Sequence, residues 1–190
     1  MDKHTNEAFL DFEKYKDIIE KYFSKIKVKK GTVLLREGEI SRKMFFIKEG
    51  VLRACFEHKG KDITFQFFLE RQAVSSYESF WNGTPSSLTI ESIEPSVLYV
   101  ITKQNFSKLF DENPEFKERM REVLLMRMGN YARHFMSFIR DTPKERYVTL
   151  MKEKPELLIR IPQHYIASYL GITPVSLSRI RNSVAKGGKG

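Results

Sequence analysis

Near the C-terminus, residues 161–181 of the chain read IPQHYIASYLGITPVSLSRIR. Counted from Gln163, the fifth position is Ala167 and the ninth is Gly171. Two short helices that cross steeply touch near the fifth position, where only a small side chain fits. The turn between them favours glycine, because it requires a positive φ. This pattern predicts two short helices joined by a tight turn.

The remaining constrained positions of this stretch are apolar or suited to a helix start. The side chains that the two helices would bury together are Ile166, Leu170, Ile172, Leu177 and Ile180. Thr173 is suited to cap the second helix, and Pro174 fits its first turn. Any helical hairpin shows apolar spacing, but here all seven constrained positions match. We interpret the stretch as a helix-turn-helix, whose second helix lies in the major groove of DNA.

On this interpretation the second helix presents polar side chains to DNA. Arg179 is the candidate for base readout, because arginine grips guanine O6 and N7 with two bonds; a phosphate contact or a salt bridge is the alternative role. Gln163, at the start of the first helix, is a candidate phosphate contact. The candidate DNA-binding residues are Gln163, Thr173, Val175, Ser176, Ser178, Arg179 and Arg181.

The distribution of charge agrees with a polyanionic partner at this end of the chain. The formal net charge is +9, and residues 141–190 carry nine basic against four acidic side chains. After Glu156 the sequence contains no acidic residue. Arg181, Lys186 and Lys189 therefore add attraction for DNA of any sequence.

The composition limits the other classes of protein. With 190 residues and an ordinary apolar fraction, a soluble globular chain is expected. There is no membrane-length apolar run and no signal peptide, and Cys55 is the only cysteine, so we expect a cytoplasmic location and no disulfide. No nucleophile–base pair, phosphate-binding glycine loop or metal cluster has a recognisable spacing. We therefore expect no enzyme activity, no metal and no cofactor.

Upstream, the sequence pattern of residues 28–101 is typical of short strands. Apolar runs alternate with turn residues about every ten positions, and Ile63, Phe65 and Phe67 alternate with Thr64 and Gln66. This spacing predicts a small antiparallel barrel or jelly roll. Its phenylalanines are expected in the core, and a roomy apolar pocket among them is the alternative. The residues concerned are Phe45, Phe46, Phe56, Phe65, Phe67, Phe68 and Phe80.

Helical spacing returns after Thr102. It predicts one short helix over 103–110 and a long one from Pro114 to about Arg140. So long a helix either packs on the barrel alone or pairs with a second copy, and we favour a homodimer. The expected interface residues are Phe116, Met120, Leu124, Arg127, Met128, Tyr131 and Phe135.

A domain boundary is expected at Asp141-Thr142. Thr142 to Glu145 form a capping box with proline at the first helical position, which starts a new helix through about Lys152. Residues 157–161 are predicted as a short strand. One or two short helices are expected within residues 6–24. The predicted domains are a sensor (1–110), a dimerisation helix (111–140) and a DNA-binding domain (141–190).

A β-roll, a long helix and a helix-turn-helix, in this order, resemble the cyclic-AMP receptor protein and fumarate–nitrate regulator (Crp/Fnr) family. The resemblance covers about residues 15–181 and includes Gly31, residues 45–53 (FFIKEGVLR) and residues 177–180 (LSRI). It implies an α+β fold with a jelly-roll sensor, a dimerisation helix and a winged helix-turn-helix. Only nine residues follow Arg181, so the wing is expected to be reduced or absent. Val175 replaces a glutamate of the family's recognition helix, so operator preference does not carry over.

The sensor departs from the nucleotide-binding members of that family. Their phosphate-binding cassette has Gly-Glu followed by Arg-Ser or Arg-Thr, and alignment puts Ser75-Ser76 and Ser86-Ser87 at these positions. Serine cannot supply the positive charge that a buried phosphate needs. Glu78 replaces the lost acid if the register slips by two. We predict that cyclic AMP does not bind in the family mode, and the candidate pocket residues are Ser75, Ser76, Glu78, Ser86 and Ser87.

The single cysteine excludes the iron–sulfur branch of that family. Cys55 and His58 are read as structural residues rather than a metal or haem site, and a redox role of Cys55 is the alternative. The sequence thus predicts a dimeric transcription regulator whose partners are double-stranded DNA with a near-palindromic operator, RNA polymerase and an unknown small-molecule effector, with no membrane. The alternative is a ligand-binding module of the cyclic-nucleotide type that acts on a protein partner.

Overall fold

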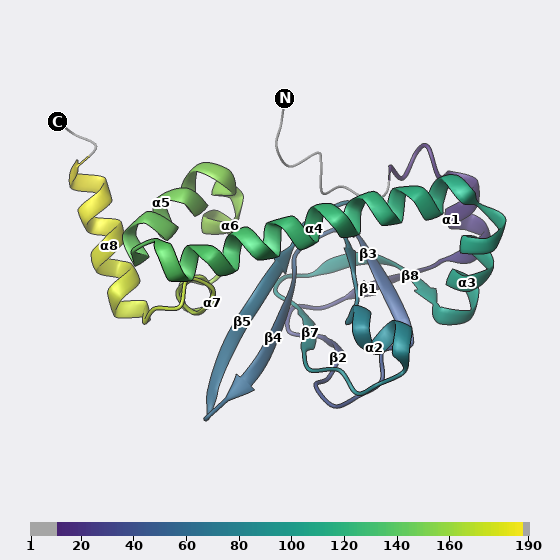
Figure 1. The fold of residues 1–190 in the computed structure, drawn as a ribbon, viewed down its shortest axis with the longest axis horizontal. Helices are drawn as coiled ribbons and strands as arrows, with labels where there is room; N and C mark the ends of the chain where they lie inside the picture. The colour runs from purple at the N-terminus through teal and green to yellow at the C-terminus, as the bar shows by residue number, and fades with distance from the viewer. Residues whose placement is uncertain (1–10, 188–190) are drawn as a thin grey trace. The chain divides into compact units, whose positions relative to one another are not determined.

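The computed structural model describes residues 11–187, which form eight strands and eight helices (Figure 1). The strands are β1 (Ser24–Val28), β2 (Val33–Leu35), β3 (Lys43–Glu49), β4 (Leu52–His58), β5 (Lys61–Phe68), β6 (Ala73–Val74), β7 (Thr89–Ser92) and β8 (Ser96–Thr102). The helices are α1 (Lys16–Tyr22), α2 (Tyr77–Asn82), α3 (Lys103–Glu112), α4 (Pro114–Arg140), α5 (Pro143–Glu153), α6 (Pro155–Arg160), α7 (Gln163–Tyr169) and α8 (Pro174–Gly187).

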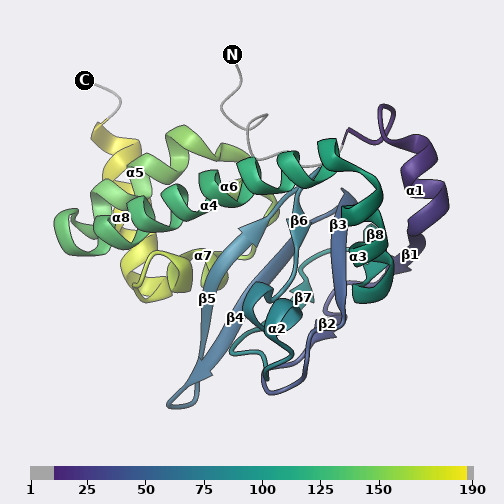
Figure 2. The ribbon, with the colours of Figure 1, turned by 45° about the vertical axis from the view of Figure 1, so that its right-hand side comes forward.

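The strands form two four-stranded sheets, in the orders β1-β8-β3-β6 and β2-β7-β4-β5. The described pairings are antiparallel, and β4 and β5 lie side by side as long neighbouring strands (Figure 2). The predicted antiparallel roll is therefore confirmed. Within the described residues the chain divides into two compact units, one of residues 11–56 and 65–127 and one of residues 57–64 and 128–187.

Strand β3 is buried on both of its faces, which explains its nearly continuous apolar sequence. Phe45 and Ile47 point to the core between the two sheets, where they meet Leu52 and Leu98. Their neighbours Met44 and Phe46 belong to a second core that helices cover. That second core contains Ile19, Tyr22, Met44, Phe46, Ala73, Phe80, Ile101, Phe106, Leu109, Phe116, Met120 and Val123.

Most of the phenylalanines expected in the core are buried, but Phe65 is 39% exposed. On this part of β5 the buried residues are Thr64 and Gln66. The strand period was correct, whereas the face that is buried changes along the strand. Phe56 is half-buried.

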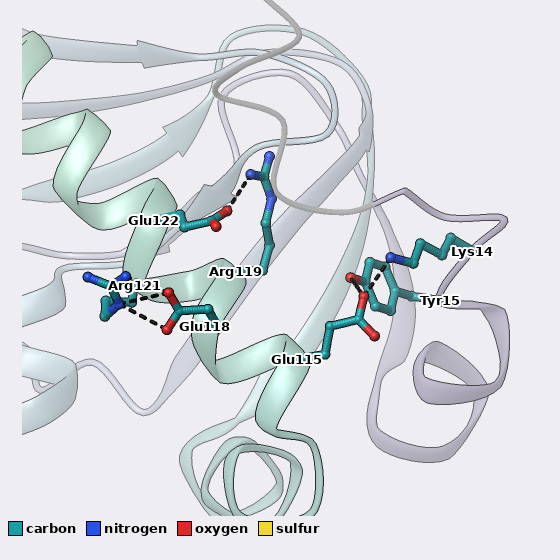
Figure 3. A network of polar contacts seen from close by, with 7 residues as sticks. All are labelled: Lys14, Tyr15, Glu115, Glu118, Arg119, Arg121 and Glu122. Atoms are coloured by element: carbon teal, nitrogen blue, oxygen red, sulfur yellow. Dashed lines mark hydrogen bonds and ion pairs between the residues drawn. The ribbon is translucent and has the colours of Figure 1, made fainter.

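Polar contacts hold the start of α4 against the segment before α1 (Figure 3). Glu115 accepts a hydrogen bond from Lys14 Nζ at 2.6 Å and one from Tyr15 OH at 3.2 Å. Along α4 itself, Arg119 pairs with Glu122 and Arg121 pairs with Glu118, as Figure 3 shows. These ion pairs lie at the protein surface, where water screens the charges, so they contribute little to stability.

Two expectations about helices have clear outcomes. The capping box at Thr142 is present: Thr142 Oγ1 accepts from the Glu145 N–H at 3.3 Å, and Glu145 Oε2 accepts from the Thr142 N–H at 2.7 Å. The strand predicted over 157–161 is wrong, because residues 155–160 form the helix α6. Pro155 stands at the first helical position of α6, where proline favours the start of a helix because its missing N–H needs no partner there.

Candidate nucleic-acid interface and sensor site

Helices α7 and α8 form the predicted hairpin. Ala167 and Leu177 are almost completely buried, and Ile166 and Leu170 with them. Gly171 has φ +69°, and a Cβ atom added there would lie 2.7 Å from Cε1 of Phe138. The turn thus requires glycine at position 171 for two reasons: the positive φ, and the aromatic ring that packs against it.

The N-terminus of α8 is capped as expected. Thr173 Oγ1 accepts a hydrogen bond from the Ser176 N–H at 3.2 Å and lies 3.0 Å from Ser176 Oγ. Both hydroxyl groups therefore take part in the cap. Readout of a base by either would compete with this local bond.

Most of the candidate DNA-binding side chains are exposed. Arg179, Ser178 and Val175 are exposed on α8, and Gln163 is exposed at the start of α7. Thr173 and Arg181 are also exposed, Ser176 is half-buried, Lys186 is exposed, and Lys189 lies outside the described residues. Because residues 157–187 contain no acidic side chain, the surface of the hairpin carries only positive formal charges.

Arg146, on α5, fixes the hairpin and was not expected from the sequence. It is 9% exposed, and its Nε and Nη2 donate to the Leu170 carbonyl at 3.2 and 3.0 Å. Its Nη1 donates to the Asp141 carbonyl at 2.7 Å, and its Cζ lies 4.7 Å from the ring centre of Phe138. One buried cation thereby holds the C-terminal carbonyl of α7 and the end of α4 together.

Two further contacts hold α7. Tyr169 stacks on His134 of α4, with ring centres 4.4 Å apart and planes 11° apart. Burial lowers the pKa of His134 below its ordinary value, and the positive charges of Lys154 and Arg146 lower it further. Ser168 Oγ accepts from the Thr64 N–H at 2.9 Å and donates to the Asp62 carbonyl at 3.0 Å, so this part of β5 belongs to the same contact unit as α7.

Two serines of the predicted sensor pocket, Ser75 and Ser86, form hydrogen bonds within the protein. Ser75 Oγ lies 3.1 Å from Ser41 Oγ and donates to the Lys43 carbonyl at 3.2 Å. Ser86 Oγ donates to the Leu88 carbonyl at 2.7 Å. Of the remaining candidates, Ser76 is buried, whereas Glu78 and Ser87 are exposed. The hydroxyl groups of Ser75 and Ser86 thus bond to separate parts of the backbone rather than to one shared site.

The face of α4 that was expected in a dimer is partly buried in the protomer. Phe116, Met120 and Arg127 are at most 4% exposed, so they are not available to a second copy. Leu124 and Tyr131 are half-buried, whereas Met128 and Phe135 are exposed. Phe116 and Met120 belong instead to the second core described above.

A different stripe of α4 is exposed. It consists of Leu125, Met128, Ala132, Phe135 and Ile139, which follow one another at steps of three, four, three and four residues. Met128 and Phe135 are each 67% exposed, and Ile139 is 75% exposed. This is the spacing of the apolar seam of a coiled coil.

Other kinds of site find no support in the described part of the chain. Residues 11–187 contain no group of three or more histidine, cysteine, aspartate or glutamate side chains that would hold a metal ion. Cys55 is buried on β4. None of the described helices has both the length and the apolar character needed to cross a membrane.

Comparison with known proteins finds a likeness for the N-terminal part of the chain. Residues 25–113 match the family model of the cyclic nucleotide-binding domain. The chain is 32% identical over 100 residues to a cyclic nucleotide-gated potassium channel of Rhizobium etli; the match covers 52% of this chain and 26% of the channel. The match therefore concerns one domain of that channel.

Solved structures extend the likeness beyond that domain. FixK2 from Bradyrhizobium japonicum has a TM-score of 0.77 and 16% identity, with 87% of this chain and 86% of FixK2 covered. A putative transcriptional regulator of the Crp/Fnr family from Eubacterium rectale has a TM-score of 0.70 and 16% identity, with 95% and 88% covered. The chain therefore shares the fold of these solved structures: the part that matches the cyclic nucleotide-binding domain model precedes a C-terminal helical region. The resemblance predicted from the sequence is confirmed at the level of the fold.

Proposed function

We propose that this chain is a sequence-specific DNA-binding transcription regulator that acts as a homodimer. The observation that carries the proposal is the α7–α8 hairpin, whose outer surface exposes Arg179 and has no acidic side chain. Phosphate groups meet only positive charge there, which favours binding to any DNA. The exposed side chains on α8 then discriminate between bases.

Arg179 carries most of the base readout in this proposal. It is exposed on α8 within the second turn after the cap, and Ser178 and Val175 are exposed beside it. A bidentate contact with guanine contributes about 1–3 kcal/mol of discrimination. Since Thr173 and Ser176 bond to each other, few other side chains remain for sequence readout.

The second copy is the proposed occupant of the exposed stripe on α4. Leu125, Met128, Ala132, Phe135 and Ile139 have coiled-coil spacing, and large apolar side chains so exposed are uncommon on a monomer. A twofold dimer presents two recognition helices about one helical turn of DNA apart, so the operator is expected to be a near-palindrome. RNA polymerase and a small-molecule effector are the further partners that we propose, in the cytoplasm.

Selection from random DNA by gel shift, followed by sequencing, tests the function. Enrichment of an inverted repeat is expected, and recovery of no such repeat would refute the proposal in favour of the alternative module that acts on a protein. Arg179→Ala is expected to relax specificity at one base position per half-site, with a loss of about 1–3 kcal/mol. Arg179→Lys is the matched control, because it keeps the charge and removes the planar fork.

The oligomeric state is tested separately by light scattering after gel filtration. Met128→Glu or Phe135→Glu introduces a charge into the stripe and is expected to give monomers. Arg133→Glu introduces the same side chain on the same helix but off the stripe, and the dimer should persist. A monomeric wild-type chain at micromolar concentration would contradict the proposed interface.

A further inference from the structure

Arg127, on α4, is buried without an acidic partner. Only 4% of it is exposed, and among the described residues no carboxylate forms an ion pair with it. Its Nη1 donates to the Ala73 carbonyl at 2.6 Å and to Tyr77 OH at 3.0 Å. Its Nη2 is shielded from solvent and has no hydrogen-bond partner within the described part of the chain.

This arrangement is costly in free energy unless something completes it. Arginine stays protonated at every ordinary pH, so burial cannot neutralise it. A buried charge without a counter-ion destabilises a protein, and a buried polar atom without a partner is a place where a bound group can be accommodated with a gain in hydrogen bonding. The other buried arginines are satisfied: Arg53 pairs with Glu91 at 2.7 Å, and Arg146 donates to two carbonyl groups.

The surroundings of Arg127 belong to the sensor domain. Its guanidinium carbon lies 5.5 Å from the ring centre of Phe68 on β5. Ala73 and Tyr77 flank Ser75 and Ser76, which align with part of the family's phosphate-binding cassette. A positive charge is thus present beside this segment, but it comes from α4 and not from the cassette.

We propose that Arg127 is the anchor of an effector site for a small monocarboxylate with an apolar body. This inference rests on the proposed regulator function and names the class of its effector. One carboxylate balances the single positive charge, and the two N–H groups of Nη2 donate to its oxygen atoms. Phe68 and Tyr77 supply aromatic surface for the rest of the molecule.

A cyclic nucleotide fits these surroundings less well. Its ribose hydroxyl groups need polar partners, and the Ser75 and Ser86 hydroxyls already bond to the fold. Glu78 is exposed. Because Nη2 is shielded from solvent, a ligand reaches it only after a rearrangement around Arg127, which is a residue of α4. Binding is therefore coupled to the position of α4, the helix that carries the exposed apolar stripe.

The test measures ligand binding to the full chain in the absence of DNA. The probes are acetate, butyrate and benzoate, with inorganic phosphate and cyclic AMP as comparison anions, in thermal-shift and calorimetric titrations. Butyrate or benzoate is expected to raise the melting temperature, and more than acetate does. In Arg127→Met the affinity is expected to fall about tenfold or more, because a charge-assisted hydrogen bond is lost.

Two further variants keep the test decisive. Arg121→Gln removes an exposed charge from the same helix and should bind the probes as the wild type does. Arg127→Lys keeps the charge and should retain weaker binding. Without ligand, Arg127→Met is expected to be at least as stable as the wild type, because it removes an unpaired buried charge.

Several results would overturn the inference: no carboxylate binds at millimolar concentration, Arg127→Met binds as well as the wild type, or only phosphate or cyclic AMP depends on Arg127. These outcomes are independent of DNA binding. A chain that selects an inverted repeat but binds no carboxylate refutes the effector site alone. A chain that binds benzoate through Arg127 but selects no DNA refutes the regulator function alone.

Discussion

Replacement of Gly171 by alanine tests how the turn of the hairpin is held. The residue has φ +69°, where an alanine costs about 1–2 kcal/mol. The new Cβ would also lie 2.7 Å from Cε1 of Phe138, and overpacking of this kind costs about 1–3 kcal/mol. We therefore expect Gly171→Ala to lower the free energy of unfolding by about 2–5 kcal/mol in total.

Gly60→Ala is the matched control for the backbone part of this cost. Gly60 has φ +73° in the same contact unit, and a Cβ atom added there would meet nothing within 4 Å. Urea unfolding of the full chain, followed by circular dichroism, measures both variants. The contact with the ring is isolated by Phe138→Leu and the double variant, which should show a coupling energy of about 1 kcal/mol or more. The reasoning fails if Gly171→Ala costs no more than Gly60→Ala.

Three other substitutions have defined outcomes. The pKa of His134 is lowered in the folded chain, so on acidification the unfolded chain binds a proton at a higher pH than the folded chain does. The stability that His134 contributes above pH 6.5 is therefore lost as the pH falls. His134→Phe should flatten this part of the dependence of the unfolding free energy on pH, measured with urea. Arg146→Met leaves two carbonyl groups without their charged donor and should destabilise the chain by about 2–4 kcal/mol in the same assay. Arg140→Met, at an exposed ion pair, should leave the stability nearly unchanged. Gly50→Ala would put a Cβ 2.2 Å from Ser96 Oγ and should lower the melting temperature far more than Gly38→Ala. Gly38 also has a positive φ, +86° against +106° for Gly50, and a Cβ added there meets nothing within 4 Å; equal shifts would contradict this reasoning.

The dimer interface shows where sequence reasoning needed tertiary information. The periodicity of residues 116–138 correctly predicted one long helix. It did not reveal that α4 has two apolar faces, one at Phe116 and Met120 against the protomer and one at Met128 and Phe135 exposed. Side chains at steps of three or four residues fit either face of a helix, and the choice depends on strands that are distant in the sequence.

Arg127 and Arg146 make the same point for polar residues. Both look like ordinary charged residues of an amphipathic helix. The structure buries both, and their partners are backbone carbonyls of Ala73, Asp141 and Leu170. Every residue has a backbone carbonyl, so the sequence does not indicate which carbonyl accepts a hydrogen bond from a buried arginine.

Local signals were sufficient for the elements that need no distant partner. The capping box at Thr142, the glycine turn at Gly171 and the cap at Thr173 are each determined by residues within a few positions of one another. The sequence alone therefore determined the α+β class, the antiparallel roll, the long helix and the helix-turn-helix. Only the tertiary structure decided which face of α4 is free, which serines are already bonded and which arginine is buried without a counter-charge. The physical reason is that propensity, capping and turn geometry act over a few residues, whereas burial and charge compensation depend on which distant segments fold together.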